Sequence, residues 1–293
     1  MVEFKDGWPV KTREFQNHHF DSRVWNGFEF RDDDIVVATY GKAGTTWMQQ
    51  IVGQLIFAGE EQVPVHEMSP WLDMRVFQPE NLAALAAQTH RRFIKTHLPV
   101  DALVFSPRAK YLYIGRDGRD VAVSLYNHHA SANEHWYRML NDTPGRVGPP
   151  IPPPAPDART AFATWLNEDG APFWPFFSSV RAWWAVRHLP NVQFVHFADL
   201  KRDREGQMRR IADFLGIRLT PAQWTAALEH TSFEYMRAHG ERTVPAGGAI
   251  FNGGANAFLH KGQAGRWREL LTDADSAAYA ARVAQELEPA CAR

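Results

Sequence analysis

The sequence predicts an α/β fold, a single domain in which helices flank a central parallel β-sheet. Two observations support this prediction: short apolar strands alternate with helices along the chain, and the first strand leads through a glycine loop into a helix. Right-handed crossovers between such strands would place ligands at the carboxyl ends of the strands. No internal repeat or domain boundary interrupts the pattern, so residues 1–293 are assigned to one domain.

The first strand, the glycine loop and the first helix follow one another between residues 32 and 59. Three aspartates form a solvated turn before the apolar run Ile35–Thr39, which predicts a short strand. Residues 45–58 carry apolar side chains at helical spacing, and Gly59 is suited to end the helix. The segment therefore predicts the first half of a βαβ unit.

The same alternation continues through the rest of the chain. Further strands are predicted at residues 92–97, 110–114 and 191–197. A helix begins near Asp120, whose carboxylate suits an N-cap or first-turn position, and another runs over 205–215 until Gly216 stops it. Thr272 and Asp275 resemble a capping box at the start of a closing helix.

Two segments lack periodicity. Residues 143–156 hold so many prolines that neither a helix nor a central strand can continue through them. A surface loop or a lid over the site is the favoured interpretation, and a proline-rich ligand for an SH3-type domain is the alternative. Residues 240–265 are rich in glycine and are read as a second loop. Both are expected to be excursions near the functional site.

Composition narrows the classes of function. A net charge of -1 gives no basic field for nucleic acid, so an anion must be bound locally. Cys291 is the single cysteine, which excludes an internal disulfide. The sequence shows no signal region and no membrane-length apolar run, so a cytoplasmic protein without membrane attachment is expected. The 11 Trp and 19 Phe indicate large core residues or a pocket for a flat apolar ligand.

The glycine loop has the composition of an anion site. A helix N-terminus offers unpaired N–H groups, Gly41 and Gly44 allow close approach, and Lys42, Thr45 and Thr46 supply a charge and two hydroxyls. The lysine precedes the last glycine, so the loop departs from the Walker pattern G-x-x-x-x-G-K-[ST]. A plain glycine turn is the alternative interpretation of this loop.

A second candidate pair ends the strand at residues 92–97. Lys95 and His97 are two positions apart, so both side chains can point into one crevice. Beside a phosphate loop, the pair would be a general base with an electrostatic partner. A structural histidine and a solvated lysine are the alternative.

A third candidate follows the strand at residues 110–114. Arg116 leaves the strand end where an anion could be held by two hydrogen bonds, and Ser124, about one turn into the next helix, could donate another. Surface ion pairs among Arg116, Asp117, Arg119 and Asp120 are the alternative.

Four separated blocks resemble the cytosolic sulfotransferase family, whose sulfuryl donor is 3′-phosphoadenosine 5′-phosphosulfate (PAPS) and whose nucleotide product is 3′,5′-adenosine bisphosphate (PAP). Residues 40–47, YGKAGTTW, resemble the family's Y-P-K-S-G-T-T-W loop, and residues 94–99, IKTHLP, its K-T-H-L-P strand end. Residues 116–124 resemble its R-x-x-x-D-V-A-V-S block, and residues 258–267 its terminal R-K-G-x-x-G-x-W block. The resemblance runs from about residue 32 to 272 and implies a P-loop-like, nucleoside-kinase-like three-layer sandwich.

The resemblance also implies roles for individual residues. Lys42, Gly44, Thr45, Thr46 and Trp47 would surround the 5′-phosphosulfate, while Arg116 and Ser124 would hold the 3′-phosphate. His97 would be the general base, with Lys42 and Lys95 stabilising the transferring group. The remaining nucleotide contacts would come from Phe197, Thr231, Phe233, Met236, His260, Lys261 and Gly262.

Four departures from the family pattern stand out. Gly41 replaces the usual proline, which loosens a turn, and Ala43 replaces the usual serine. His260 stands where arginine is usual, so one contact to the 3′-phosphate would be weaker or pH-dependent. The K-x-x-x-T-V-x-x-x-E segment of many animal members is missing, which leaves the oligomeric state open.

The predicted reaction is transfer of the sulfuryl group from PAPS to a small acceptor, by in-line displacement and without a metal. A sulfuryl group carries less negative charge than a phosphoryl group, so Lys42 and a helix N-terminus could suffice. A phenol, an apolar alcohol or a natural-product hydroxyl is the favoured acceptor, with an amine as an alternative. Side chains that could line its pocket are Phe20, Trp25, Phe77, Trp136, Trp174 and Phe177. The alternative functions are a P-loop kinase or NTPase and a non-catalytic nucleotide-binding relative.

Overall fold

Four parallel strands form the central sheet of the computed structural model, which describes residues 2–259 and 262–292. In spatial order the strands are β4 (Phe93–Thr96), β3 (Ile35–Thr39), β5 (Lys110–Gly115) and β6 (Val192–His196). Val36 on β3 pairs with Ile94 on one side and with Tyr111 on the other. The predicted parallel sheet is confirmed, and the loops that follow all four strands leave from one edge.

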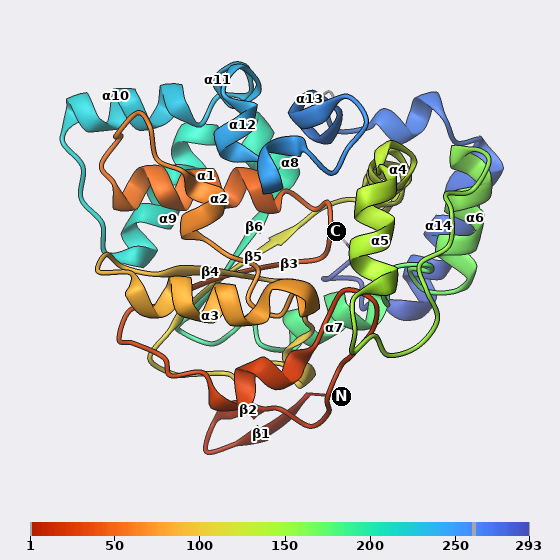
Figure 1. Cartoon of the computed structure of the whole chain (residues 1–293), viewed down its shortest axis with the longest axis horizontal. Coiled ribbons are helices and arrows are strands. Elements are labelled where there is room, and N and C mark those ends of the chain that lie inside the picture. The colour runs from red at the N-terminus through yellow and green to blue at the C-terminus, as the bar shows by residue number, and fades with distance from the viewer. Residues whose placement is uncertain (1, 260–261, 293) are drawn as a thin grey trace.

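Helices cover both faces of this sheet, as Figure 1 shows. Helices α1 (Thr45–Ile56) and α9 (Arg204–Leu215) pack on one face, where Ile35 and its neighbours at alternate positions form one buried cluster. Helix α7 (Phe177–Ala185) packs on the other, where Val36 belongs to a larger cluster. Because side chains alternate along a strand, β3 supplies both clusters, and the three-layer arrangement follows.

The remaining elements connect and extend these layers. The other helices are α2 (Val65–Met68), α3 (Gln78–Ala87), α4 (Gly118–Ser131), α5 (Glu134–Asp142), α6 (Ala158–Asn167), α8 (Phe197–Arg202), α10 (Pro221–His230), α11 (Phe233–Ala238), α12 (Gly240–Thr243), α13 (Gly254–Leu259) and α14 (Asp273–Glu286). Short 3-10 turns occupy η1 (Ser22–Gly27), η2 (Arg75–Phe77), η3 (Val100–Ala102), η4 (Pro245–Gly248) and η5 (Arg266–Glu269).

Several element boundaries match the expectations closely. The capping box of Thr272 and Asp275 begins α14, and Gly216 ends α9 in the left-handed region at φ 71°. Helix α4 begins at Gly118 with Asp117 as its N-cap, so Asp120 occupies the first turn. The last predicted strand ends one residue early, because Phe197 begins helix α8.

An N-terminal hairpin was not expected from the sequence. Strands β1 (Glu3–Lys5) and β2 (Trp8–Val10) pair antiparallel around Asp6 and Gly7, whose φ angles are 53° and 82°. Two successive residues with positive φ are typical of a two-residue hairpin turn, and Asp-Gly is a strong signal for it. The local chemistry was therefore present in the sequence and was overlooked.

The two irregular segments differ from each other. Residues 143–156 contain no helix or strand, as their prolines predict. The prediction of one long glycine-rich loop over residues 240–265 is wrong, because α12, η4 and α13 lie within it. Four-residue to six-residue helices are too short to show a periodicity, so the sequence pattern missed them.

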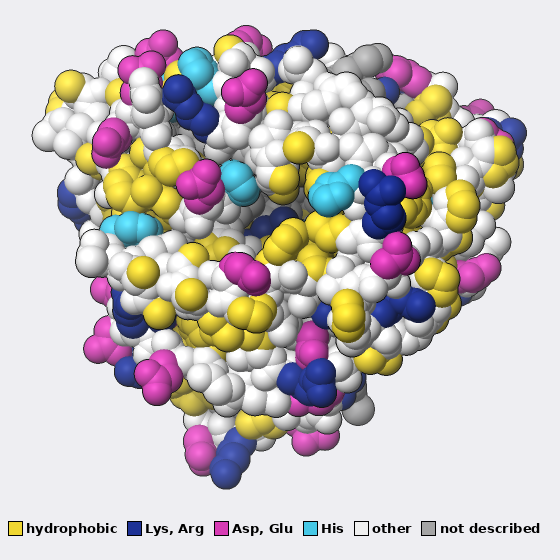
Figure 2. All heavy atoms as spheres, in the orientation of Figure 1, with side chains coloured by type: hydrophobic (Ala, Val, Ile, Leu, Met, Phe, Trp, Pro, Cys, Tyr) yellow, Lys and Arg dark blue, Asp and Glu magenta, His cyan; other side chains and the backbone are white. Residues whose placement is uncertain are grey.

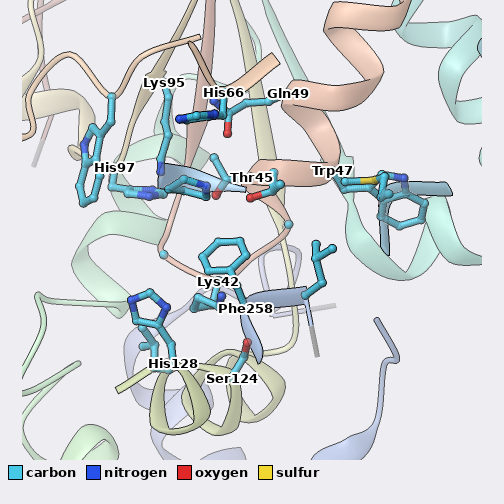
Figure 3. Close-up of a pocket in the computed structure, with 18 of the residues that line it drawn as sticks. Lys42, Thr45, Trp47, Gln49, His66, Lys95, His97, Ser124, His128 and Phe258 are labelled. Carbon is cyan, nitrogen blue, oxygen red and sulfur yellow. The ribbon is translucent and has the colours of Figure 1, made fainter. Parts of the chain in front are cut away.

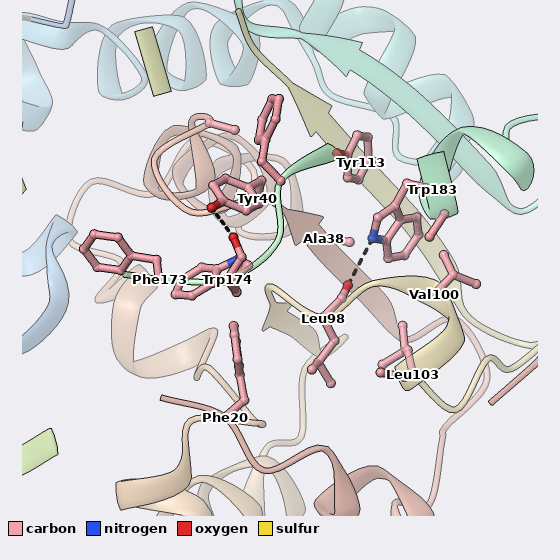
Figure 4. Packing of buried hydrophobic residues seen from close by; sticks show 14 of the residues in the cluster. Phe20, Ala38, Tyr40, Leu98, Val100, Leu103, Tyr113, Phe173, Trp174 and Trp183 are labelled. Atoms are coloured by element: carbon pink, nitrogen blue, oxygen red, sulfur yellow. Dashed lines mark hydrogen bonds between the residues drawn. The ribbon is translucent and has the colours of Figure 1, made fainter. Parts of the chain in front are cut away.

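Two hydrogen bonds between side chains and main-chain carbonyl groups tie connecting segments to the larger core. Tyr40 donates its hydroxyl to the Trp174 carbonyl oxygen at 2.6 Å, and the Trp183 indole donates to the Leu98 carbonyl oxygen at 3.1 Å (Figure 4). Both contacts hold the chain directly after a strand of the sheet, on the side where the cavity opens. Within the described ranges, no helix is both long enough and apolar enough to span a membrane.

Candidate active site

A cavity of about 860 Å³ opens at the carboxyl ends of the four parallel strands. Each strand contributes the residues that follow it: the glycine loop after β3, His97 after β4, Arg116 after β5 and Phe197 after β6. In Figure 2 the hollow lies near the middle of the face, with apolar and histidine side chains around it and basic side chains deep inside. This is the position at which open parallel sheets bind ligands.

The glycine loop exposes the start of helix α1 to the cavity. Gly44 is the N-cap, at φ 123°, and no side chain caps the helix, so the first N–H groups of α1 are available to a ligand. A Cβ atom at Gly44 would lie 2.8 Å from Ile114 Cδ1, so only glycine fits. Lys42 has a positive φ of 65°, and the loop carries Thr45, Thr46 and Trp47 on the cavity wall.

The glycine loop and the end of β4 each place a lysine in the cavity wall, and the nearby Asp73 carboxylate favours the charged form of Lys95. Burial, together with the nearby Lys95 and Arg116 charges, lowers the pKa of Lys42 to about 7. Burial lowers the pKa of Lys95 to about 8. The ammonium groups lie 3.9 Å from the Phe258 ring and 4.5 Å from the Trp71 ring, respectively, and neither forms an ion pair with a described residue. Both charges are therefore available to an anion.

Arg116 holds the glycine loop and retains one unused donor. Its guanidinium donates to the carbonyl oxygens of Lys42 at 3.1 Å and Gln263 at 3.0 Å, and it lies 3.8 Å from the Asp120 carboxylate. Its Nε is buried and meets no acceptor among the described residues. Burial lowers the pKa of Arg116, which nevertheless remains charged. A buried guanidinium N–H without a partner is a candidate anion contact.

His97 is fixed by the neighbouring strand. Its Nδ1 lies 2.8 Å from the Thr39 carbonyl oxygen and 3.0 Å from Thr39 Oγ1. Because a carbonyl can only accept, Nδ1 carries the proton and Nε2 keeps its lone pair. Burial, followed by the Lys95 charge, holds the pKa of His97 well below its usual range. The imidazole packs edge-on against Trp71 at 4.7 Å and stacks on Trp174 at 5.7 Å, so it is a neutral base in an aromatic wall.

Figure 3 shows how these groups face one another. Lys95 and His97 lie on one side of the cavity, with Thr45 near its centre. Lys42, Ser124 and Phe258 lie across from them. The β4 end and the glycine loop thus present a base and two lysines to one space, as the strand pattern predicted for Lys95 and His97.

Most of the predicted site residues are brought together. The cavity is lined by Lys42, Gly44, Thr45, Thr46, Trp47, Lys95, His97, Arg116, Ser124, Phe197, Phe233, Met236 and Gly262. Phe197 lies between two of them, 4.3 Å from the Arg116 guanidinium and 5.5 Å from the Trp47 ring. His260 and Lys261 lie outside the described residues.

Thr231, also expected among the nucleotide contacts, lies behind the cavity wall. It is fully buried and is absent from the cavity wall. Its hydroxyl donates to the Ala227 carbonyl oxygen at 2.8 Å, and its own carbonyl accepts from the Trp47 indole at 2.9 Å. Thr231 therefore positions Trp47 from behind. The hydroxyl at the end of helix α10 bonds back to the preceding turn, which the sequence alone did not reveal.

The aromatic candidates divide between wall and core. Phe77, Trp136 and Trp174 line the cavity, whereas Phe20, Trp25 and Phe177 are fully buried core residues outside its wall. Further apolar lining comes from Trp71, Met74, Met139, Phe173, Ile250, Phe251 and Phe258. The segment 240–265 thus contributes to the wall, but no residue of 143–156 does, so the proline-rich loop is not a lid in this structure.

The space beside Gly41 in the glycine loop is filled by a side chain from a distant part of the sequence. A Cβ atom at position 41 would lie 2.9 Å from the Trp174 ring, so the indole occupies the space beside the glycine. The Tyr40 hydroxyl bonds to the carbonyl oxygen of that same tryptophan (Figure 4). Trp174, far away in the sequence, therefore restrains this turn by packing.

Asp73 is a buried residue that sequence reasoning missed. Its carboxylate accepts hydrogen bonds from Thr96 Oγ1 at 2.5 Å, Trp25 Nε1 at 2.9 Å and Trp71 Nε1 at 2.5 Å. Burial raises its pKa to about 6 despite these bonds. Asp73 thereby fixes Trp71, which flanks both Lys95 and His97. It lies in a loop, where no pattern separates it from the other aspartates.

Histidine, cysteine and acidic side chains do not converge as a metal-binding group of three or more anywhere in the described part of the chain. The cavity is lined instead by cationic side chains and by the uncapped start of α1. The cationic residues in its wall are Lys42, Lys95, Arg116, Lys201, Arg202, Arg204 and Arg266.

The chain resembles known proteins in both sequence and fold. A model of the sulfotransferase domain matches residues 32–288. A glycolipid sulfotransferase of Mycobacterium bovis is 32% identical over 292 residues, covering 92% of this chain and 89% of its own. Retinol dehydratase, crystallised with androsterone and PAP, aligns with a TM-score of 0.68 and 25% identity over 91% of this chain and 84% of its own. Mouse sulfotransferase SULT7A1, complexed with PAP, aligns with a TM-score of 0.69 and 20% identity, covering 98% of this chain and 95% of its own.

Proposed function

This chain belongs to the sulfotransferase domain family, and we propose that it moves the sulfuryl group of PAPS to a hydroxyl of a small aromatic or apolar acceptor. The observation that supports this most strongly is the arrangement of His97, whose free Nε2 shares one cavity with Lys42, Lys95 and Arg116. A neutral imidazole beside three cationic side chains suits an acceptor that loses a proton while an anionic donor is cleaved.

The residues present fit the donor. The uncapped start of α1 and Lys42 would hold the 5′-phosphosulfate, since both attract anions. Arg116, with its partnerless Nε, and Ser124 would hold the 3′-phosphate, near Gly262. Trp47 and Phe197 meet edge to face at 5.5 Å and would contact the adenine as an apolar surface. The donor supplies the activated sulfuryl group.

His97 would act as the general base. Its Nε2 takes the proton of the acceptor hydroxyl, whose oxygen forms the new S–O bond while the bond from sulfur to the 5′-phosphate oxygen breaks. Lys42 stabilises the negative charge that develops on this departing phosphate, and Lys95 offsets charge on the sulfuryl oxygens. No bond in this scheme is made to a metal.

The wall around His97 supports an apolar acceptor. Trp71 and Trp174 contact its ring, and Phe173, Trp136 and Met139 continue the same surface. Burial keeps His19 and His128, which also line the cavity, in the neutral form by lowering the pKa of each well below its usual range. Such a wall favours a neutral, flat molecule over a charged one or a sugar.

A direct experiment is an acceptor screen with PAPS, in which the release of PAP and the sulfated product are both measured. Phenols and apolar alcohols are expected to be sulfated in the absence of added metal. Amines and monosaccharides form the comparison groups. Exclusive sulfation of either group would contradict the proposed acceptor class, and hydrolysis of ATP in place of PAPS turnover would contradict the proposed reaction.

A further inference from the structure

A pair of adjacent histidines forms a directed hydrogen-bond chain behind the acceptor side of the cavity. His18 Nε2 lies 2.9 Å from the Pro172 carbonyl oxygen, and His18 Nδ1 lies 2.5 Å from His19 Nδ1. The carbonyl can only accept, so His18 Nε2 carries a proton. Burial keeps His18 neutral by lowering its pKa, so its Nδ1 accepts and His19 Nδ1 must donate. These two hydrogen bonds therefore fix the tautomer of His19, with the proton on Nδ1 and the lone pair on Nε2.

That lone pair faces the cavity without a partner from the chain. The His19 side chain lines the cavity yet is only 3% exposed, and its Nε2 bonds to no described residue. Five aromatic rings surround it, those of Phe20, Trp71, Trp136, Phe173 and Trp174. A lone pair in such an apolar wall is best satisfied by a ligand that supplies a hydrogen-bond donor.

His19 and His97 share the same two indole rings. The Trp71 ring centre lies 4.7 Å from that of His97 and 5.9 Å from that of His19. The two imidazole centres are therefore at most about 10.6 Å apart, which is the sum of these distances. A rigid molecule of one or two fused rings can extend from one histidine to the other.

We propose that His19 Nε2 accepts a hydrogen bond from a second hydroxyl of the acceptor, so that the enzyme selects rigid dihydroxy-aromatic compounds. One hydroxyl hydrogen-bonds to His97 Nε2 and is sulfated. The other hydroxyl donates a hydrogen bond to His19 Nε2 and is not sulfated. This inference rests on the proposed function, because it assumes that the acceptor hydroxyl is deprotonated at His97. His18 is a positioning residue, since it acts only by fixing the tautomer of His19.

The test compares naphthalenediols of different hydroxyl spacing with 2-naphthol as acceptors, with PAPS as donor. At least one diol is expected to exceed 2-naphthol about tenfold in kcat/KM, because 2-naphthol offers no second donor to His19 Nε2. Having two equivalent hydroxyls would by itself raise kcat/KM about twofold over 2-naphthol. If no diol exceeds 2-naphthol by more than about twofold in kcat/KM, the inference is overturned. Equal sulfation would leave the proposed function intact, whereas sulfation of neither class would overturn both.

Variants identify the residue responsible. His19→Phe should reduce the diol preference to about twofold, while PAP binding, followed by thermal shift, reports whether the variant is folded. His129→Phe is the matched control, because His129 is also a buried histidine that packs against Trp136 and Phe173 but does not line the cavity. Its diol preference should equal that of the wild type. A His19→Phe variant that is folded and keeps the preference would overturn the inference.

The His18→Phe variant tests whether His18 sets the tautomer of His19, because it should change which second substituent of the acceptor is preferred. Loss of a merely structural histidine would not change that preference. Without the acceptor on His18, His19 is free to carry its proton on Nε2 and to donate to the ligand. In a methoxy-naphthol the methoxy oxygen, which can accept a hydrogen bond but cannot donate one, replaces the second hydroxyl, so this acceptor should then gain at least severalfold relative to the matching diol. An unchanged ratio between these two acceptors in His18→Phe would contradict the proposed tautomer chain. If the buried variant does not fold, the diol comparison in the wild type still decides the inference.

Discussion

His97 Nδ1 lies 2.8 Å from the main-chain carbonyl oxygen of Thr39, so a backbone group of β3 orients the imidazole that follows β4. Thr39 also reaches the glycine loop, since its hydroxyl lies 2.6 Å from the Thr45 hydroxyl. One strand end therefore positions the proposed base and the start of α1 together. Parallel pairing of β3 and β4 is what brings these segments into register.

His97→Ala should reduce kcat by about 10²- to 10⁴-fold, because the acceptor proton would have no base. PAP affinity, measured by calorimetry, should change little, since His97 would contact the acceptor and not the nucleotide. His188→Ala, a histidine away from the cavity wall, serves as the control. Wild-type turnover in His97→Ala would exclude the assigned role.

Nucleotide binding should take up protons at pH 8. Burial lowers the pKa of Lys42 to about 7 and that of Lys95 to about 8, so both are partly deprotonated in the free protein at that pH. A bound phosphate raises the pKa of a neighbouring lysine and favours its charged form, and it is itself fully ionised at pH 8. PAP affinity should accordingly fall as the pH rises from 7 to 9.

Calorimetry in buffers of different ionisation enthalpy measures this uptake. Up to about one proton per PAP is expected near pH 8, and Lys42→Met should remove most of it. Lys201→Met, at the cavity rim, is a control for the loss of a lysine. Binding without any proton exchange at pH 8 would show that the lysines are already charged in the free protein.

Gly41→Ala should destabilise the protein by about 1–3 kcal/mol, because the added methyl group would lie 2.9 Å from the Trp174 ring. Trp174→Leu should relieve that clash, so the double variant should be more stable than the sum of the two single effects predicts. Urea unfolding of the four proteins measures the coupling. Gly27→Ala is the control, since nothing lies within 4 Å of its added Cβ. Strict additivity at positions 41 and 174 would contradict the packing explanation.

Asp73→Asn should lower stability by about 1–3 kcal/mol even though it removes a buried charge. Three donors converge on the carboxylate, from Thr96, Trp25 and Trp71, and an amide would turn its own N–H groups toward at least one of them. Asp32→Asn, whose exposed carboxylate faces Arg108, should have almost no effect. Thermal unfolding at pH 7 compares the two, and equal melting temperatures would contradict the role assigned to Asp73.

The sequence by itself determined the strands, the uncapped glycine loop and the placement of Lys42, His97 and Arg116 at strand ends. These features depend on local chemistry: apolar runs, glycine at positive φ, and the fact that parallel strands end at one edge of a sheet. The N-terminal hairpin, too, depends on local chemistry, because Asp6 and Gly7 form the two-residue turn that an Asp-Gly pair favours.

Only the tertiary structure decided which buried side chains face the cavity and which stand behind it. Thr231 positions Trp47 from the core, Trp174 packs beside Gly41, and the His18–His19 chain ends on Pro172. In each case the partners are more than a hundred residues apart in the sequence, so no periodicity or spacing links them. Their roles depend on how α/β layers pack against one another, because the same histidine or tryptophan serves equally well as core or as wall until its neighbours are fixed.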